Sequence, residues 1–167
     1  MANNAMRFLY RLNVYQSTII LTLLSIPWLF YLLMQPRTIS TSINWAYTAL
    51  IYFILSFILY LFLQWISRSG RSNFRKKLVT FTRIYIRFHV AAALLGVTSL
   101  LMHVLLMAKF GLMESRAGVS GMIAIGGLAV LLFTGYLRKR KSSGKRRRFH
   151  RFTAYLFLFF VLIHMLL

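Results

Sequence analysis

Five long apolar runs, separated by short polar segments, dominate the pattern of hydrophobic and polar positions along the chain. The runs are free of charged residues and cover about residues 17–35, 45–66, 88–108, 119–137 and 152–167. A helix needs about 17–25 apolar residues to cross the hydrocarbon core of a bilayer. The pattern therefore predicts an all-α integral membrane protein, a bundle of five transmembrane helices. Because the last run is short, its helix is expected to begin within the preceding basic residues.

The first residues differ from the rest of the chain. Residues 1–16 carry Arg7 and Arg11, and no small-residue cleavage site follows the next apolar run. We expect a retained cytosolic lead-in over residues 1–16 and a single transmembrane domain over residues 17–167. Pro27 is expected to kink the first helix. Trp45 and Trp65 stand where aromatic residues anchor helices at membrane interfaces, with packing as the alternative role.

Composition supports a membrane protein and excludes several kinds of chemistry. The chain is 59% hydrophobic and 13% charged, with no cysteine and one acidic residue, Glu114. The lack of cysteine excludes disulfides, thiolate-bound iron–sulfur clusters and covalent haem attachment. A single acid excludes catalysis by a carboxylate pair, a two-metal site and a relay of buried carboxylates.

The 21 Lys and Arg residues are distributed unevenly between the two sides of the predicted spans. The lead-in holds two, the loop between spans two and three holds seven, and the loop between spans four and five holds nine. The two other loops share three, which are Arg37, Lys109 and Arg116. By the positive-inside rule the amino terminus is cytosolic and the carboxyl terminus lies outside. This placement favours contact with anionic lipids and argues against nucleic-acid binding.

Two segments beside the spans have their own patterns. Residues 71–87 alternate basic and apolar positions, which fits either an interfacial amphipathic helix or an inward extension of span three. Residues 138–148 form a basic run, and we expect a solvated loop with a flexible Ser-Ser-Gly centre there.

The four histidines form two pairs with the same spacing: His89 with His103, and His150 with His164, each 14 residues apart. Fourteen helical residues span roughly 21 Å and return to nearly the same face. Spans three and five both run outward by the charge rule, so His89 would lie opposite His150, and His103 opposite His164. Ionisable groups at membrane depth indicate function. The spacing predicts two non-covalent haem b groups between helices three and five, with these four histidines as iron ligands.

Four neighbouring residues are further candidates for haem contact. Gly96 lies midway between His89 and His103, where it would admit a flat macrocycle or a neighbouring helix. Phe157 is the midpoint on the other helix and would lie between two haems, or else face lipid or pack. Arg87 and Arg151 flank the inner histidines and could pair with haem propionates, with lipid contact as the alternative.

Residues 75–167 resemble the ferric reductase-like transmembrane domain. The resemblance rests on FHVAAALLGVTSLLMH (88–103), with its internal glycine, and on FTGYLRKRKSSGKRRRFHRFTAYLFLFFVLIH (133–164), with a His-Arg pair opening a helix that holds a second histidine. It implies that the four histidines are axial ligands and that Phe157 lies between the haems. Oxidoreductases of that family add a sixth helix and a cytosolic flavin and nicotinamide domain, and no dinucleotide fingerprint occurs in this sequence.

The expected function is therefore transmembrane electron transfer, in the haem-bearing membrane subunit of an oxidoreductase. A separate cytosolic flavoprotein reductase or a quinol would be the electron donor, and the acceptor would lie outside the cell membrane. Two alternatives stay open at this point: a quinone-coupled cytochrome b subunit of a respiratory complex, and a haem-free membrane adaptor.

Overall fold

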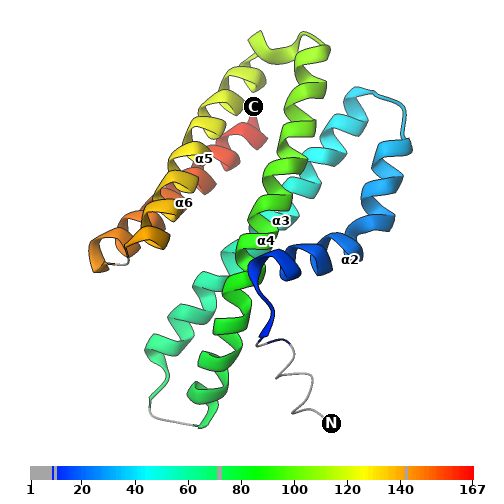
Figure 1. The fold of residues 1–167 in the computed structure, drawn as a ribbon. Coiled ribbons are helices and arrows are strands. Elements are labelled where there is room, and N and C mark those ends of the chain that lie inside the picture. The colour runs from blue at the N-terminus through cyan, green and yellow to red at the C-terminus, as the bar shows by residue number, and fades with distance from the viewer. Residues whose placement is uncertain (1–8, 10, 71–72, 142) are drawn as a thin grey trace. The chain divides into compact units, whose positions relative to one another are not determined.

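The computed structural model describes residues 9, 11–70, 73–141 and 143–167, and all secondary structure in them is helical. The helices are α2 (Val14–Met34), α3 (Ile39–Arg68), α4 (Asn73–Lys109), the short 3-10 helix η1 (Leu112–Glu114), α5 (Arg116–Arg140) and α6 (Gly144–Leu166) (Figure 1). The five α-helices are each long and apolar enough to cross a membrane. The five predicted spans are thus confirmed, and the chain is a multi-pass membrane protein. Arg7, Arg71 and Ser142 lie outside the described residues.

Side-chain caps fix where several of these helices begin. Asn13 accepts a hydrogen bond from the Gln16 amide at 2.8 Å, and the Gln16 side chain accepts one from the Asn13 amide at 2.9 Å. Thr38, Ser115 and Ser143 cap α3, α5 and α6 in the same way. Such caps satisfy amide groups that have no partner within the helix. The cap at Ser143 lets α6 begin inside the basic run, as predicted from the shortness of the last span.

The helices form two compact units, residues 1–106 and residues 107–167. In the first unit, α3 and α4 make an antiparallel hairpin, and α2 packs against α3. The Trp28 indole donates to Thr48 Oγ1 at 2.9 Å, and the Tyr52 hydroxyl donates to Ser25 at 2.6 Å. Helix α2 contains Pro27 and changes direction along its length in Figure 1. A proline removes one backbone hydrogen bond and bends a helix in this way.

Helix α4 has 37 residues and is therefore about 55 Å long, well beyond the roughly 30 Å of hydrocarbon. Residues 73–87 continue the helix that carries His89, so the extension of span three is the alternative that the structure confirms. Aromatic rings hold this part of α4 to α3. The Phe62 ring lies 5.2 Å from that of Phe81 and 5.1 Å from that of Tyr85, both edge-on. The Tyr85 hydroxyl also donates to the Leu55 carbonyl at 2.6 Å.

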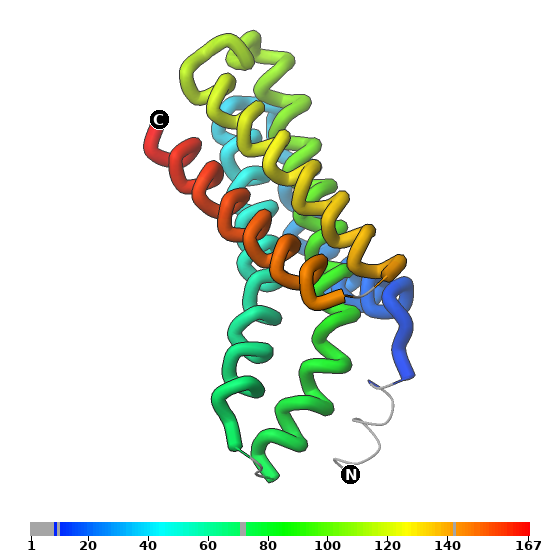
Figure 2. The backbone as a smooth tube through the Cα atoms, turned by 90° about the vertical axis from the view of Figure 1, so that its left-hand side faces the viewer, coloured from blue at the N-terminus to red at the C-terminus, as the bar shows by residue number. Residues whose placement is uncertain are grey.

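In the second unit, α5 and α6 run side by side in opposite directions (Figure 2). Ala124, Leu128 and Phe157 are buried between neighbouring side chains. The turn between the helices is closed by Arg146, whose guanidinium donates to the Leu137 and Lys141 carbonyls at 3.0 and 3.1 Å. The basic loop is therefore short, and most of the run expected to be loop belongs to helix.

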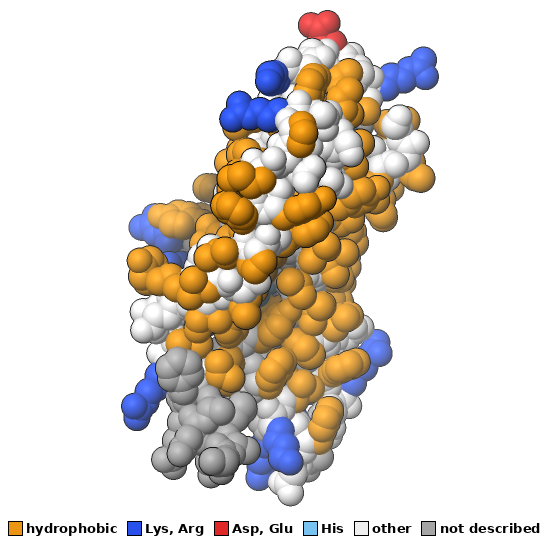
Figure 3. All heavy atoms as spheres, turned by 90° about the vertical axis from the view of Figure 1, so that its right-hand side faces the viewer, with side chains coloured by type: hydrophobic (Ala, Val, Ile, Leu, Met, Phe, Trp, Pro, Cys, Tyr) orange, Lys and Arg blue, Asp and Glu red, His pale blue; other side chains and the backbone are white. Residues whose placement is uncertain are grey.

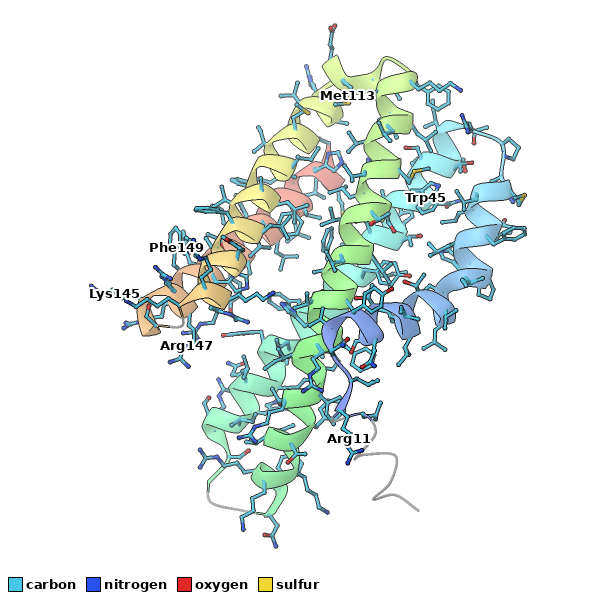
Figure 4. The ribbon with its side chains drawn as sticks, in the orientation of Figure 1. Arg11, Trp45, Met113, Lys145, Arg147 and Phe149 are labelled. Atoms are coloured by element: carbon cyan, nitrogen blue, oxygen red, sulfur yellow. The ribbon has the colours of Figure 1, made fainter. Side chains whose placement is uncertain are left out.

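Small and hydroxylated side chains fill the interiors of the units, while large apolar side chains point outward. Ala91 and Ser42 are fully buried, whereas Leu24 is 76% and Leu105 64% exposed. Hydrophobic side chains make up most of the surface seen in Figure 3. This distribution is typical of helices packed in lipid, where small residues permit close approach. Trp65 is exposed, but Trp45 (labelled in Figure 4) is buried, so Trp45 has the packing role and not the interfacial one.

Candidate functional site

The two histidines of α4 are each held by a serine of α3. His103 Nδ1 lies 2.9 Å from the Ser42 carbonyl oxygen, and the Ser42 hydroxyl donates to the His103 carbonyl at 3.1 Å. His89 Nδ1 lies 2.7 Å from the Ser56 carbonyl oxygen, and the Ser56 hydroxyl donates to the His89 carbonyl at 3.1 Å. Each serine and histidine thus form a reciprocal pair that joins the two helices and fixes the ring.

These contacts decide which ring nitrogen carries the proton. A carbonyl oxygen can only accept a hydrogen bond, so the neutral imidazoles of His89 and His103 must donate from Nδ1. The lone pair of each ring then resides on Nε2. Histidines that bind metals show the same arrangement, because a hydrogen bond from the other ring nitrogen sets the tautomer and the ring orientation.

The second unit holds its two histidines with hydroxyl groups of α5. His164 Nδ1 lies 3.0 Å from Ser120 Oγ, and His150 Nδ1 lies 3.1 Å from Thr134 Oγ1. Both hydroxyls donate to carbonyls of their own helix, Ser120 to Ala117 at 2.9 Å and Thr134 to Leu131 at 2.8 Å. Since the single hydroxyl hydrogen is directed to the carbonyl, the oxygen accepts the Nδ1 proton. His150 and His164 therefore have the same tautomer as His89 and His103.

Two glycines give the α6 imidazoles their space. A Cβ atom at Gly121 would lie 3.1 Å from His164 Cε1, and one at Gly135 would lie 3.3 Å from His150 Cε1. Each glycine directly follows the hydroxyl residue that binds the same histidine, so Ser120-Gly121 and Thr134-Gly135 are repeated units of one design. Close packing had been predicted for Gly121, whereas Gly135 was missed.

The hydroxyl residues repeat the histidine spacing. Ser42 and Ser56 are 14 residues apart, and so are Ser120 and Thr134. In each antiparallel hairpin the hydroxyl nearer the start of the chain pairs with the histidine farther along it. Sequence reasoning missed all four hydroxyls, although their spacing was present as a signal.

The remaining candidate residues have clear places within their own units. Gly96 lies against α3, because a Cβ atom there would come within 2.9 Å of the Phe53 ring. Phe157 is 7% exposed, so it packs within the unit and does not face lipid. Arg87 is half-buried and Arg151 is exposed. Haem contact by these four residues stays a prediction, as does the pairing of α4 histidines with α6 histidines.

The donor set fits haem b. Axial ligation needs neutral imidazoles that present Nε2, and all four rings have the tautomer that does so. All four histidines are half-buried, and among the described residues every buried side-chain nitrogen or oxygen has a hydrogen-bond partner. No group of three or more His, Asp or Glu side chains able to hold a metal ion occurs in the described part of the chain.

Protein-family models, curated proteins and solved structures were compared with the chain, and none of them matches. Membership of the ferric reductase-like family therefore stays a prediction that rests on the motifs in residues 75–167.

Proposed function

We propose that this protein is the haem-bearing membrane subunit of an oxidoreductase and that it transfers electrons across the cell membrane. One observation carries the proposal. Four histidines, placed 14 residues apart in two helices, all have Nδ1 engaged by the preceding helix and the Nε2 lone pair available to iron in chemical terms. A purely structural role in helix packing gives no reason for the same tautomer and the same spacing at four positions.

The proposed ligand pairs are His89 with His150 and His103 with His164. Within each unit, one member of a pair lies nearer the basic end of its hairpin, and the other is about 21 Å farther along the helix. Haem iron with two imidazole ligands supplies a reversible one-electron change and leaves no open position for oxygen. The hydroxyls and carbonyls of α3 and α5 hold the four rings in the required orientation. Gly96 and Phe157 would line the macrocycles, and Arg87 and Arg151 would neutralise propionates.

The charge distribution gives the direction. The basic ends of both hairpins carry most of the Lys and Arg residues, so these ends would face the cytosol, with the amino terminus cytosolic and the carboxyl terminus outside. A cytosolic flavoprotein reductase with an acidic surface, or a membrane quinol, would deliver electrons at that side. An acceptor outside the membrane would take them up.

A reduced-minus-oxidised spectrum, with haem quantified per chain, tests the proposal. The protein would be expressed with ample haem and purified in detergent. Two haem b per chain are expected. A folded protein without a b-type absorption band would overturn the proposal and favour a haem-free adaptor.

The electron donor requires a separate measurement. A flavoprotein donor predicts that quinone analogues leave the spectrum and the reduction rate unchanged. A quinone analogue that shifts the haem spectrum or blocks haem reduction would assign the chain to the quinone-coupled cytochrome b subunits.

A further inference from the structure

We propose that Ser120 and Thr134 are positioning residues: their hydroxyls set the tautomer of His164 and His150, and thereby the strength with which these rings bind iron. The part of this inference that concerns iron rests on the proposed function. The part that concerns the tautomer concerns only residues of this chain.

The geometry gives these two hydroxyls a role that the serines of α3 lack. His103 and His89 donate to backbone carbonyls of Ser42 and Ser56, which persist whatever side chain stands there. His164 and His150 have Ser120 Oγ and Thr134 Oγ1 as the acceptors at Nδ1. Removal of these oxygens therefore removes the acceptor itself.

The state of each hydroxyl is also determined by its surroundings. Ser120 donates to Ala117, and Thr134 donates to Leu131, so both oxygens face the imidazole as acceptors. Thr153 lies 3.1 Å from Thr134 Oγ1 and donates to the His150 carbonyl at 3.0 Å. Ser120 and Thr134 are 8% and 3% exposed, so little water can replace a missing oxygen. An imidazole that loses its acceptor in such a place gains by moving its proton to the other nitrogen.

The first experiment is ¹⁵N NMR of the full chain, labelled at histidine and produced without haem. The wild-type protein should show the Nδ1–H form for all four rings. Thr134→Val, which keeps the shape of the side chain, should shift His150 toward the Nε2–H form, and Ser120→Ala should shift His164. Thr134→Ser should restore the wild-type signal. Ser42→Ala should leave His103 in the Nδ1–H form because its carbonyl acceptor remains.

The second experiment is titration of the same proteins with hemin, followed by absorption. Loss of a hydrogen-bond partner of a metal-bound histidine typically costs 10–100-fold in affinity. Thr134→Val and Ser120→Ala should each weaken one of the two sites by about this factor. Ser42→Ala should weaken binding by less than the lower end of this range. Ser99→Ala removes a buried hydroxyl of α4 that holds no histidine and serves as the neutral control.

Two results would overturn the inference. One is an Nε2–H form of His150 or His164 in the wild-type chain. The other is an equal effect of Ser42→Ala and Ser120→Ala on tautomer and on hemin affinity. A wild-type chain that binds no hemin would instead refute the proposed function, and the NMR comparison would still decide the positioning role.

Discussion

In the hairpin of α3 and α4 the histidines give their Nδ1 proton to backbone carbonyls, whereas in the hairpin of α5 and α6 they give it to side-chain hydroxyls. A backbone carbonyl is present with any residue, but a hydroxyl is present only with Ser, Thr or Tyr. The first hairpin therefore holds its imidazoles by the fold alone, and the second depends on particular side chains. The comparison teaches that equal spacing does not imply equal tolerance to substitution.

The hairpins also differ in how the two helices are joined. In the first, Ser42 and Ser56 donate across to α4 while they accept from it, so each histidine brings two interhelical hydrogen bonds. In the second, Ser120 and Thr134 donate within α5. Glycines beside the rings compensate, because Gly121 and Gly135 let the imidazoles lie directly against the α5 backbone. The second hairpin is consequently held more by close packing.

The largest effect is expected when a ligand is removed from either hairpin. His103→Leu and His164→Leu should each lower haem content from two to about one per chain, and the double variant should lose no more, because both residues serve one site. His89→Leu combined with His164→Leu should lose both haems. Haem quantified per folded chain gives the answer. Additive losses for His103 and His164 would show that the two hairpins do not share the site.

A smaller effect is expected from a change in packing of the second hairpin. Gly121→Val should lower the free energy of unfolding by about 1–3 kcal/mol, because the added atoms overlap the His164 ring. Gly126→Val is the matched control, since a Cβ atom at Gly126 meets nothing within 4 Å. Thermal unfolding in detergent micelles compares the two. Similar losses for both variants would contradict a specific close approach at Gly121.

The smallest effect concerns the interhelical hydrogen bonds themselves. Ser56→Ala should cost about 0.6 kcal/mol, an average value for such bonds between membrane helices, because His89 keeps its carbonyl acceptor. Thr134→Val should cost more, up to about 1.7 kcal/mol, because the bonds to His150 and Thr153 are both lost. The same unfolding measurement on haem-free protein compares them. A larger cost for Ser56→Ala would reverse the proposed difference between the hairpins.

The sequence predicted the helices well because length and charge alone decide membrane spans. Five apolar runs became five helices, and the continuous helix through residues 73–87 was one of two stated alternatives. The apolar pattern was less informative about helix faces, since lipid and protein interior are both apolar. Trp45 illustrates this: its place near the end of a span suggested an interfacial anchor, but the side chain is buried.

The histidines were found from the sequence, whereas their partners were not. Histidine is rare in this chain, so two pairs with equal spacing stand out. Serine and threonine are common in the spans, for example at Ser25, Thr48 and Thr98, where they donate to the preceding turn or to other neighbours. A spacing of 14 among so many hydroxyls has little weight until the register of the hairpin is known. That register depends on packing between helices, which the order of residues along one helix does not specify.

The start of α6 has a consequence for the environment of the protein. Lys145, Arg146 and Arg147 occupy its first turn, and Lys145 and Arg147 extend from it in Figure 4. A helix begins with a partial positive charge, so cations there are unfavourable, by about 0.3–1 kcal/mol each at low ionic strength. No acidic residue in that turn offsets them. Phosphate headgroups would do so, which makes the folding of this helix sensitive to the lipid composition of the bilayer around it.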